Sequence, residues 1–88
     1  VMMNEEIQNL IDSNKENIMK IYLKLLDFAD DLSLSDDVKE IAGILKLYEI
    51  LLMELKEKNN FENPVNVLKT LIDMKDNLES ELSILNAV

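Results

Sequence analysis

Apolar residues recur along this chain at alternating intervals of three and four positions, which is the spacing of one face of an α-helix. The pattern occupies three segments, about residues 4–32, 36–58 and 64–86. No segment alternates apolar and polar residues by two, as a half-buried strand does. Three helical segments and no strand predict an all-α fold. The connections between the segments are short, so successive helices are expected to be antiparallel. We expect an antiparallel up-down-up three-helix bundle of long helices, a single helical domain over residues 1–88 that is self-contained or completed by dimerisation.

The first segment carries a narrow apolar seam with one polar member, Asn14. A buried amide at such a position fixes the register or the oligomeric state of a coiled coil, whereas a frayed or solvated helix end would leave it in water. Ser13 and Asn14 are weak helix formers, but the seam stays in phase across them, so we expect one continuous helix. The apolar members of the seam are Ile7, Ile11, Ile18, Ile21, Leu25, Phe28 and Leu32.

The second segment contains the most apolar run of the chain, Ile41 to Lys56, and we expect it to be the central helix of the bundle. Its apolar arc covers about half of the helix circumference, which is wider than a one-sided surface helix needs. Gly43 lies at the edge of this arc, where it indicates either a close helix approach or simple tolerance. The arc consists of Val38, Ile41, Ile44, Leu45, Leu47, Tyr48, Leu51, Leu52 and Leu55.

Two helix starts can be recognised from their capping residues. Ser35 is the expected N-cap of the second helix, with Ser33 as the alternative, and Asp36 and Asp37 complement the positive end of the helix dipole. Asn63–Pro64 marks the start of the third helix, because Asn caps well and Pro is preset for the first helical position.

The third segment also has a broad apolar arc, with Lys75 inside it. We expect the lysine stem to cover apolar surface while the ammonium group reaches solvent. The arc consists of Val65, Val67, Leu68, Leu71, Ile72, Leu78, Leu82 and Leu85. Both broad arcs leave surplus apolar surface for a partner or a second copy. The residues predicted for this surface are Leu47, Ile50, Leu51, Met53, Leu71, Leu78 and Leu85.

The five methionines are interpreted as core-filling residues, because Met19, Met53 and Met74 are scattered along the chain and Met2 and Met3 are terminal. They do not cluster in one part of the sequence. The methionines therefore do not predict a binding surface.

The composition of the chain excludes most kinds of catalytic and cofactor-binding site. The chain has 18 acidic residues, nine basic ones that are all lysine, and a formal net charge of −9. A strongly acidic chain without arginine is a poor ligand for nucleic acids and is repelled by anionic membranes. It contains no histidine, no cysteine and one glycine, so imidazole bases, thiolates, the usual zinc sites and glycine-rich phosphate loops are excluded. We expect neither an enzyme nor a bound cofactor.

Two acidic stretches invite a metal interpretation. Asp12 to Asn17 begins like a calcium loop, but Asn17 stands where the loop needs glycine and Leu23 where it needs a bidentate glutamate. A second group of carboxylates complements helix dipoles and keeps the protein soluble, so no metal site is expected. This group consists of Asp27, Asp30, Asp31, Asp36 and Asp37.

Fold class and missing chemistry together favour a non-catalytic protein-protein interaction module, a small acidic helical adaptor, chaperone or inhibitor. Its partner is another protein or a further copy of itself, as a homodimer or higher homo-oligomer. The alternative is an acidic decoy that imitates the charge of nucleic acid and inhibits a nucleic-acid-binding protein. The lack of cysteine and of a recognisable leader at the amino end favours the cytoplasm.

Overall fold

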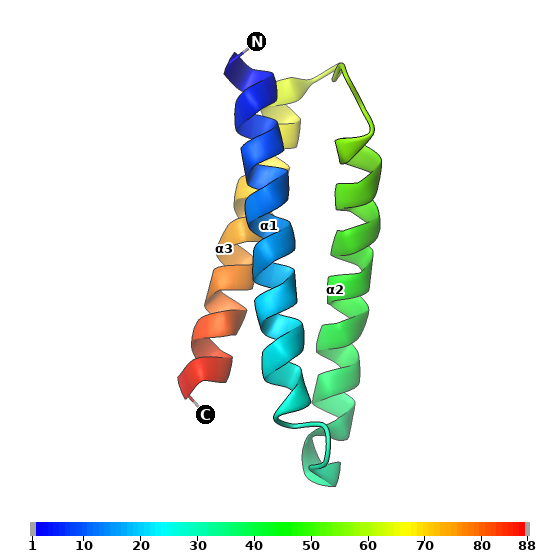
Figure 1. The fold of residues 1–88 in the computed structure, drawn as a ribbon, viewed down its shortest axis with the longest axis vertical. Coiled ribbons are helices and arrows are strands. Elements are labelled where there is room, and N and C mark those ends of the chain that lie inside the picture. The colour runs from blue at the N-terminus through cyan, green and yellow to red at the C-terminus, as the bar shows by residue number, and fades with distance from the viewer. Residues whose placement is uncertain (1, 88) are drawn as a thin grey trace.

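The computed structural model describes residues 2–87 as an antiparallel up-down-up three-helix bundle, which confirms the predicted fold class (Figure 1). The helices are α1 (Met2–Leu26), α2 (Ser35–Lys56) and α3 (Pro64–Ala87), and a short 3-10 helix, η1 (Leu32–Leu34), precedes α2. The bundle is a rod with extents of 47 × 21 × 17 Å. The first helix is continuous through Ser13 and Asn14, as the unbroken seam predicts.

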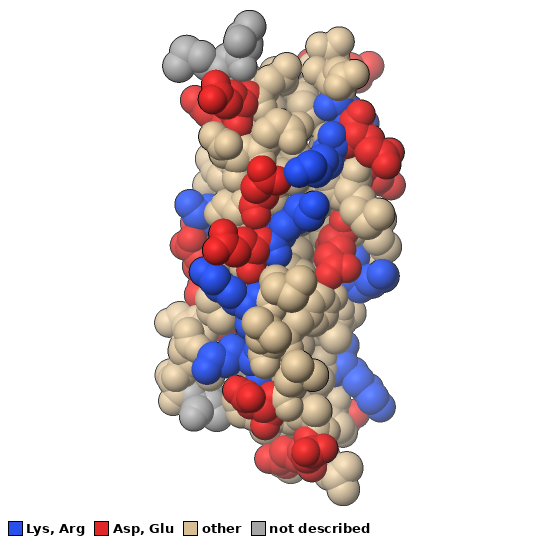
Figure 2. All heavy atoms as spheres, in the orientation of Figure 1, with Lys and Arg blue, Asp and Glu red and all other residues tan. Residues whose placement is uncertain are grey.

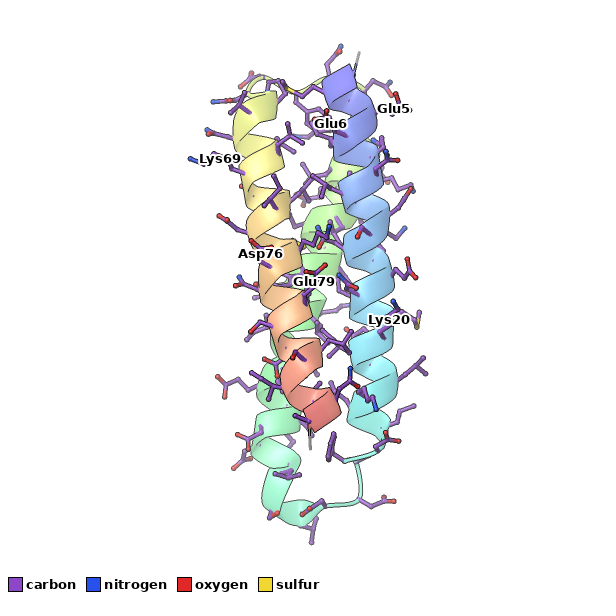
Figure 3. All side chains as sticks on the ribbon, turned by 90° about the vertical axis from the view of Figure 1, so that its left-hand side faces the viewer. Glu5, Glu6, Lys20, Lys69, Asp76 and Glu79 are labelled. Carbon is purple, nitrogen blue, oxygen red and sulfur yellow. The ribbon has the colours of Figure 1, made fainter. Side chains whose placement is uncertain are left out.

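The central helix of the bundle is α1, so the prediction that the run from Ile41 to Lys56 forms the central helix is wrong. The backbone of α1 packs closely against α3 and less closely against α2, whereas α2 and α3 hardly approach each other. Figures 1 and 3 show α1 and α3 side by side along the rod. The width of an apolar arc measures how much apolar surface a helix owns, but not how much of it the neighbouring helices cover.

The core forms where the three seams meet along the axis of the rod. α1 contributes a residue at nearly every turn, because its seam alternates by three and four without interruption. Burying each such side chain contributes about 1.5–3 kcal/mol. The buried apolar residues are Ile7, Ile11, Ile18, Ile21 and Leu25 from α1, Leu45, Leu52 and Leu55 from α2, and Leu71, Met74 and Leu78 from α3.

Asn14 lies in the middle of this core and is fully buried. Its Nδ2 donates a hydrogen bond to the backbone carbonyl of Leu71, with a donor–acceptor distance of 3.1 Å. Its Oδ1 is buried without a hydrogen-bond partner among the described residues. The amide therefore ties α1 to α3 at one register within a single chain, and the alternative of a frayed or solvated helix at this position is wrong.

α1 ends at Leu26, six residues before the predicted end at Leu32. The chain tightens there into bonds from residue i to i−3, from Asp27 N–H to the Lys24 carbonyl and from Phe28 N–H to the Leu25 carbonyl, both at 3.0 Å. Carboxylates are unfavourable at the negative carboxyl end of a helix dipole, and this stretch is rich in aspartate. Leu32 was predicted to continue the seam, but it is 88% exposed.

The predicted cap at Ser35 is also wrong, and the reason is η1. Ser35 has helical dihedral angles and is the first residue of α2, while the N-cap residue Leu34 makes no side-chain capping bond. The capping side chain is that of Asp31, which accepts bonds from the Ser33 hydroxyl at 2.6 Å and the Ser33 N–H at 3.0 Å. These bonds lower the pKa of the Asp31 carboxyl. A turn of 3-10 helix leads directly into α2 and takes over the role of its cap.

The predicted start of α3 is confirmed. Pro64 is the first helical residue, and the Asn63 side-chain oxygen accepts a hydrogen bond from the Asn66 N–H at 3.2 Å. Lys75 is half-buried, and its ammonium group lies 4.0 Å from the Glu79 carboxylate on the next turn. The lysine thus reaches outward from the apolar arc, as expected.

Gly43 provides a test of α2. An added Cβ at Gly43 would meet no atom within 4 Å, so the close-approach interpretation is wrong and the glycine is simply tolerated. We expect Gly43→Ala to raise the free energy of unfolding by about 0.5–1 kcal/mol, because alanine loses less backbone entropy on folding. Urea denaturation followed by circular dichroism measures the change. The reverse substitution next to it, Ala42→Gly, should lower stability, and a less stable Gly43→Ala protein would contradict the open environment.

Asn14 provides a second test. We expect Asn14→Leu to raise the free energy of unfolding by about 1–3 kcal/mol, because it removes a buried carbonyl that has no partner. Asn14→Asp should destabilise the protein, since burial raises the folded-state pKa of an aspartate above its unfolded value. Its stability should therefore fall as the pH rises through that folded-state pKa. Urea unfolding at pH 4 and pH 7 tests both variants, and a strongly destabilised Asn14→Leu protein would contradict this interpretation.

Candidate functional site

The first of the two acidic stretches does not have the shape of a calcium loop. Asp12 to Asn17 is a regular part of α1, so its alternate side chains diverge around the helix instead of converging on an ion. The Asp12 carboxylate accepts a hydrogen bond from the Lys56 ammonium at 2.8 Å, and this bond lowers the pKa of Asp12. Within residues 2–87, no three acidic side chains are close enough to hold a metal ion together.

None of the helices in this range combines the length and hydrophobicity of a membrane span.

The most conspicuous feature of the surface is a row of exposed apolar side chains on α2, formed by Leu47, Ile50 and Met53, which we call the outer row. Their exposed fractions are 67%, 45% and 64%. They follow one another at intervals of three, and the residues of α2 that are buried in the core occupy other positions. All three belong to the interaction surface predicted from the sequence.

The other predicted surface residues lie elsewhere. Leu71 and Leu78 are buried in the core, and Leu51 and Leu85 are half-buried against it. Leu71 and Leu78 therefore offer no surface for a partner in this fold. The physical reason is that they occupy the seam of α3, and α1 covers that seam over its whole middle part. The helical wheel identified the apolar arc of α3 correctly, but a wheel does not say which half of an arc a neighbour covers.

Sequence reasoning missed a group of apolar residues on α1. Met19, Leu23 and Leu26 are 59%, 58% and 69% exposed. At intervals of four and three they lie on one side of the helix, and they lie outside its seam, which is the signal that could have revealed them. Met19 shares a surface depression of about 440 Å³ with Met53, flanked by Lys15 and Glu49. The depression thus joins the α1 group to the outer row.

Among the methionines whose side chains the structure describes, the core-filling interpretation is confirmed only for Met74. Met74 is buried, whereas Met3, Met19 and Met53 are exposed. The side chain of Met2 lies outside what the structure describes. Exposed methionines suit a contact surface, because their unbranched and polarisable side chains adapt to different partners.

Charges of both signs surround this part of the surface. Figure 2 shows lysines interspersed with carboxylates over the upper half of the molecule and an uncharged area below the middle. The Lys20 ammonium lies 3.6 Å from the Glu16 carboxylate one turn away. Tyr22 on α1 lies next to the Glu49 carboxylate on α2. Its burial and this carboxylate raise the pKa of Tyr22. The face therefore presents apolar side chains in a mixed-charge frame.

The outer row and the α1 group thus present exposed apolar side chains on two helices of the described residues. No family model, curated protein or solved structure matches the chain. Its function is therefore inferred from its own residues and their positions.

A metal titration tests the interpretation of the acidic stretches. We expect millimolar calcium, magnesium or zinc to leave the melting temperature within about 2 °C of its value in a chelator, because an ion stabilises a protein only when it binds the folded state. Differential scanning calorimetry with each chloride salt, and with sodium chloride at matched ionic strength as control, measures this. A rise of many degrees with a single cation would contradict it.

Proposed function

We propose that this protein is a non-catalytic interaction module that binds a partner protein, or a second copy of itself, through the outer row of α2. The observation that carries the proposal is the exposure of Leu47, Ile50 and Met53 on a helix that buries only three residues in the core. Monomeric proteins seldom leave contiguous apolar patches in water unless the patches bind something. The absence of cysteine from the chain suits a reducing compartment such as the cytoplasm.

The size of the row sets the expected strength of binding. Burying three side chains of this kind contributes about 1.5–3 kcal/mol each. Association also costs at least 4 kcal/mol or so in lost translational and rotational freedom. The outer row alone therefore supports weak and reversible binding. Additional contacts with Met19, Leu23 and Leu26 of α1 can strengthen it. Reversible contact is what an adaptor, chaperone or inhibitor requires.

The acidic-decoy alternative has less support. On the face in Figure 2, lysines interrupt the carboxylates, so they do not form the continuous negative rows of a nucleic-acid backbone. The two functions respond differently to salt. Apolar association changes little between low and moderate ionic strength, whereas binding to a basic partner through a charged surface weakens steeply.

Substitution of Ile50 tests the proposal, and the chain offers a closely matched control. Ile50 and Ile72 are 45% and 46% exposed, but Ile72 lies on α3. We expect Ile50→Lys to abolish association while the protein stays helical, because a lysine in an apolar contact must be desolvated. Ile72→Lys should associate like the wild type. Sedimentation velocity at about 50 µM measures self-association.

A crosslinking experiment extends the test to foreign partners. A photoreactive residue in place of Glu54, next to the outer row, is irradiated in extract of the native cell, with and without the Ile50→Lys substitution. A crosslinked protein present with wild type and Ile72→Lys, but absent with Ile50→Lys, supports the proposal. A wild type that sediments as a monomer and gives no crosslink sensitive to Ile50→Lys would overturn it.

A further inference from the structure

A continuous groove runs between α2 and α3, the two helices whose backbones hardly approach each other. Three surface depressions of about 220, 310 and 180 Å³ lie in a row along it. The first and second share Tyr48 and Asn77, and the second and third share Ile41 and Glu81. The shared residues make the depressions one feature, which we call the α2–α3 groove.

The two walls of this groove differ in character. The α2 wall is apolar, with Ile41, Ile44, Tyr48 and Leu51 facing the groove. The α3 wall is mostly polar and includes Thr70, Asn77 and Ser80. Apolar residues return at the end near the connection between α1 and α2, where Val38, Ile84 and Leu85 line the third depression. A ligand of the groove therefore needs one apolar face and one polar face.

The charged residues along the groove are all acidic. Asp37, Asp73 and Glu81 line it, and no lysine does. The ion pairs among residues 2–87 are elsewhere, so none of these three carboxylates has a lysine ammonium within 4.0 Å in that range. Those pairs are Glu16 with Lys20, Asp12 with Lys56, and Lys75 with Glu79.

The length of the groove fits a helix. On the α3 side it extends from Thr70 to near Leu85, which at 1.5 Å per residue is about 22 Å, or four turns. A helix lying there would contact both α2 and α3 and complete a four-helix arrangement around the existing core. An amphipathic helix fills such a groove with its apolar face and keeps its polar face outward.

We propose that the α2–α3 groove binds a basic amphipathic helix of another protein. The three carboxylates select lysine or arginine beside the apolar face of that helix. A second copy of this chain is a poor occupant of this particular groove, because the groove selects a basic helix and the chain has nine lysines against 18 acidic residues. The inference goes beyond the proposed function, because none of the residues that line the groove belongs to the outer row, so the two sites can be tested and can fail separately.

Fluorescence anisotropy with designed peptides tests the groove. The probe is a labelled leucine–lysine peptide of about 16 residues with leucines at helical spacing. One control is a scrambled peptide of the same composition, and the other is a leucine–glutamate peptide with the same apolar pattern. We expect the amphipathic basic peptide to bind at least about tenfold more tightly than either control, because both the apolar face and the positive charge are required.

Two matched pairs of variants locate the binding. On α2, Ile44 and Ile50 are 44% and 45% exposed, but only Ile44 lines the groove. On α3, Glu81 lines the groove, whereas Asp76 does not and lies on the face shown in Figure 3. We expect Ile44→Lys and Glu81→Lys to weaken binding of the basic peptide about tenfold or more, and Ile50→Lys and Asp76→Lys to change it less than about threefold. Glu81→Gln, which is nearly isosteric, should weaken it in the same direction.

Circular dichroism establishes that each variant is folded, and amide chemical shifts map where the peptide lies. Shifts concentrated around Ile44 and Ser80 support the proposal. Equal binding of the scrambled peptide, or equal effects of Glu81→Lys and Asp76→Lys, would show general charge attraction and overturn it. Shifts concentrated at the outer row would overturn it too, while leaving the proposed function intact. If the peptide binds the groove but no association depends on Ile50, the groove proposal stands and the proposed function is overturned.

Discussion

The packing of α1 against α3 is the constraint on which the rest of this structure depends. α1 is the helix that contacts both others, and its narrow seam leaves little choice about which side faces inward. Within that interface, the bond from the Asn14 amide to the Leu71 carbonyl favours one register. The amide is costly, since its oxygen is buried and finds no hydrogen-bond partner in the part of the chain that the structure describes. A purely apolar seam would be more stable but would specify the alignment of the two helices less strongly.

Because α1 and α3 form the closely packed pair, α2 is attached along one flank and keeps much of its apolar surface uncovered. Two faces result. The outer row is exposed and reaches the side of α1 at Met53, and the α2–α3 groove remains open between α2 and α3. In an isolated monomer such surface lowers solubility, and the net charge of −9 offsets this through repulsion between copies. Apolar faces on an acidic body suit contacts that form and dissociate.

The outer row and the α2–α3 groove differ in the charged residues around them. Around the outer row, Lys15 and Glu49 frame the apolar residues, and Lys56 pairs with Asp12 nearby. Along the groove, Asp37, Asp73 and Glu81 face no lysine among the lining residues. In the two proposed contacts, the first face therefore places little demand on the charge of its partner, while the second favours a basic one.

The sequence by itself determined the elements that depend on local chemistry. The three-and-four spacing gave the helices and the phase of the seams, and Asn63–Pro64 gave the start of α3, because capping and periodicity act within a few residues. The wheel of α2 also placed Ile50 outside the apolar arc, in agreement with its exposure. Only the tertiary structure decided that α1 is the centre, that Leu71 and Leu78 are buried while Met19 is exposed, and that a groove separates α2 from α3. These outcomes depend on which flank of each helix its neighbours cover, and coverage is set by packing between segments far apart in the chain.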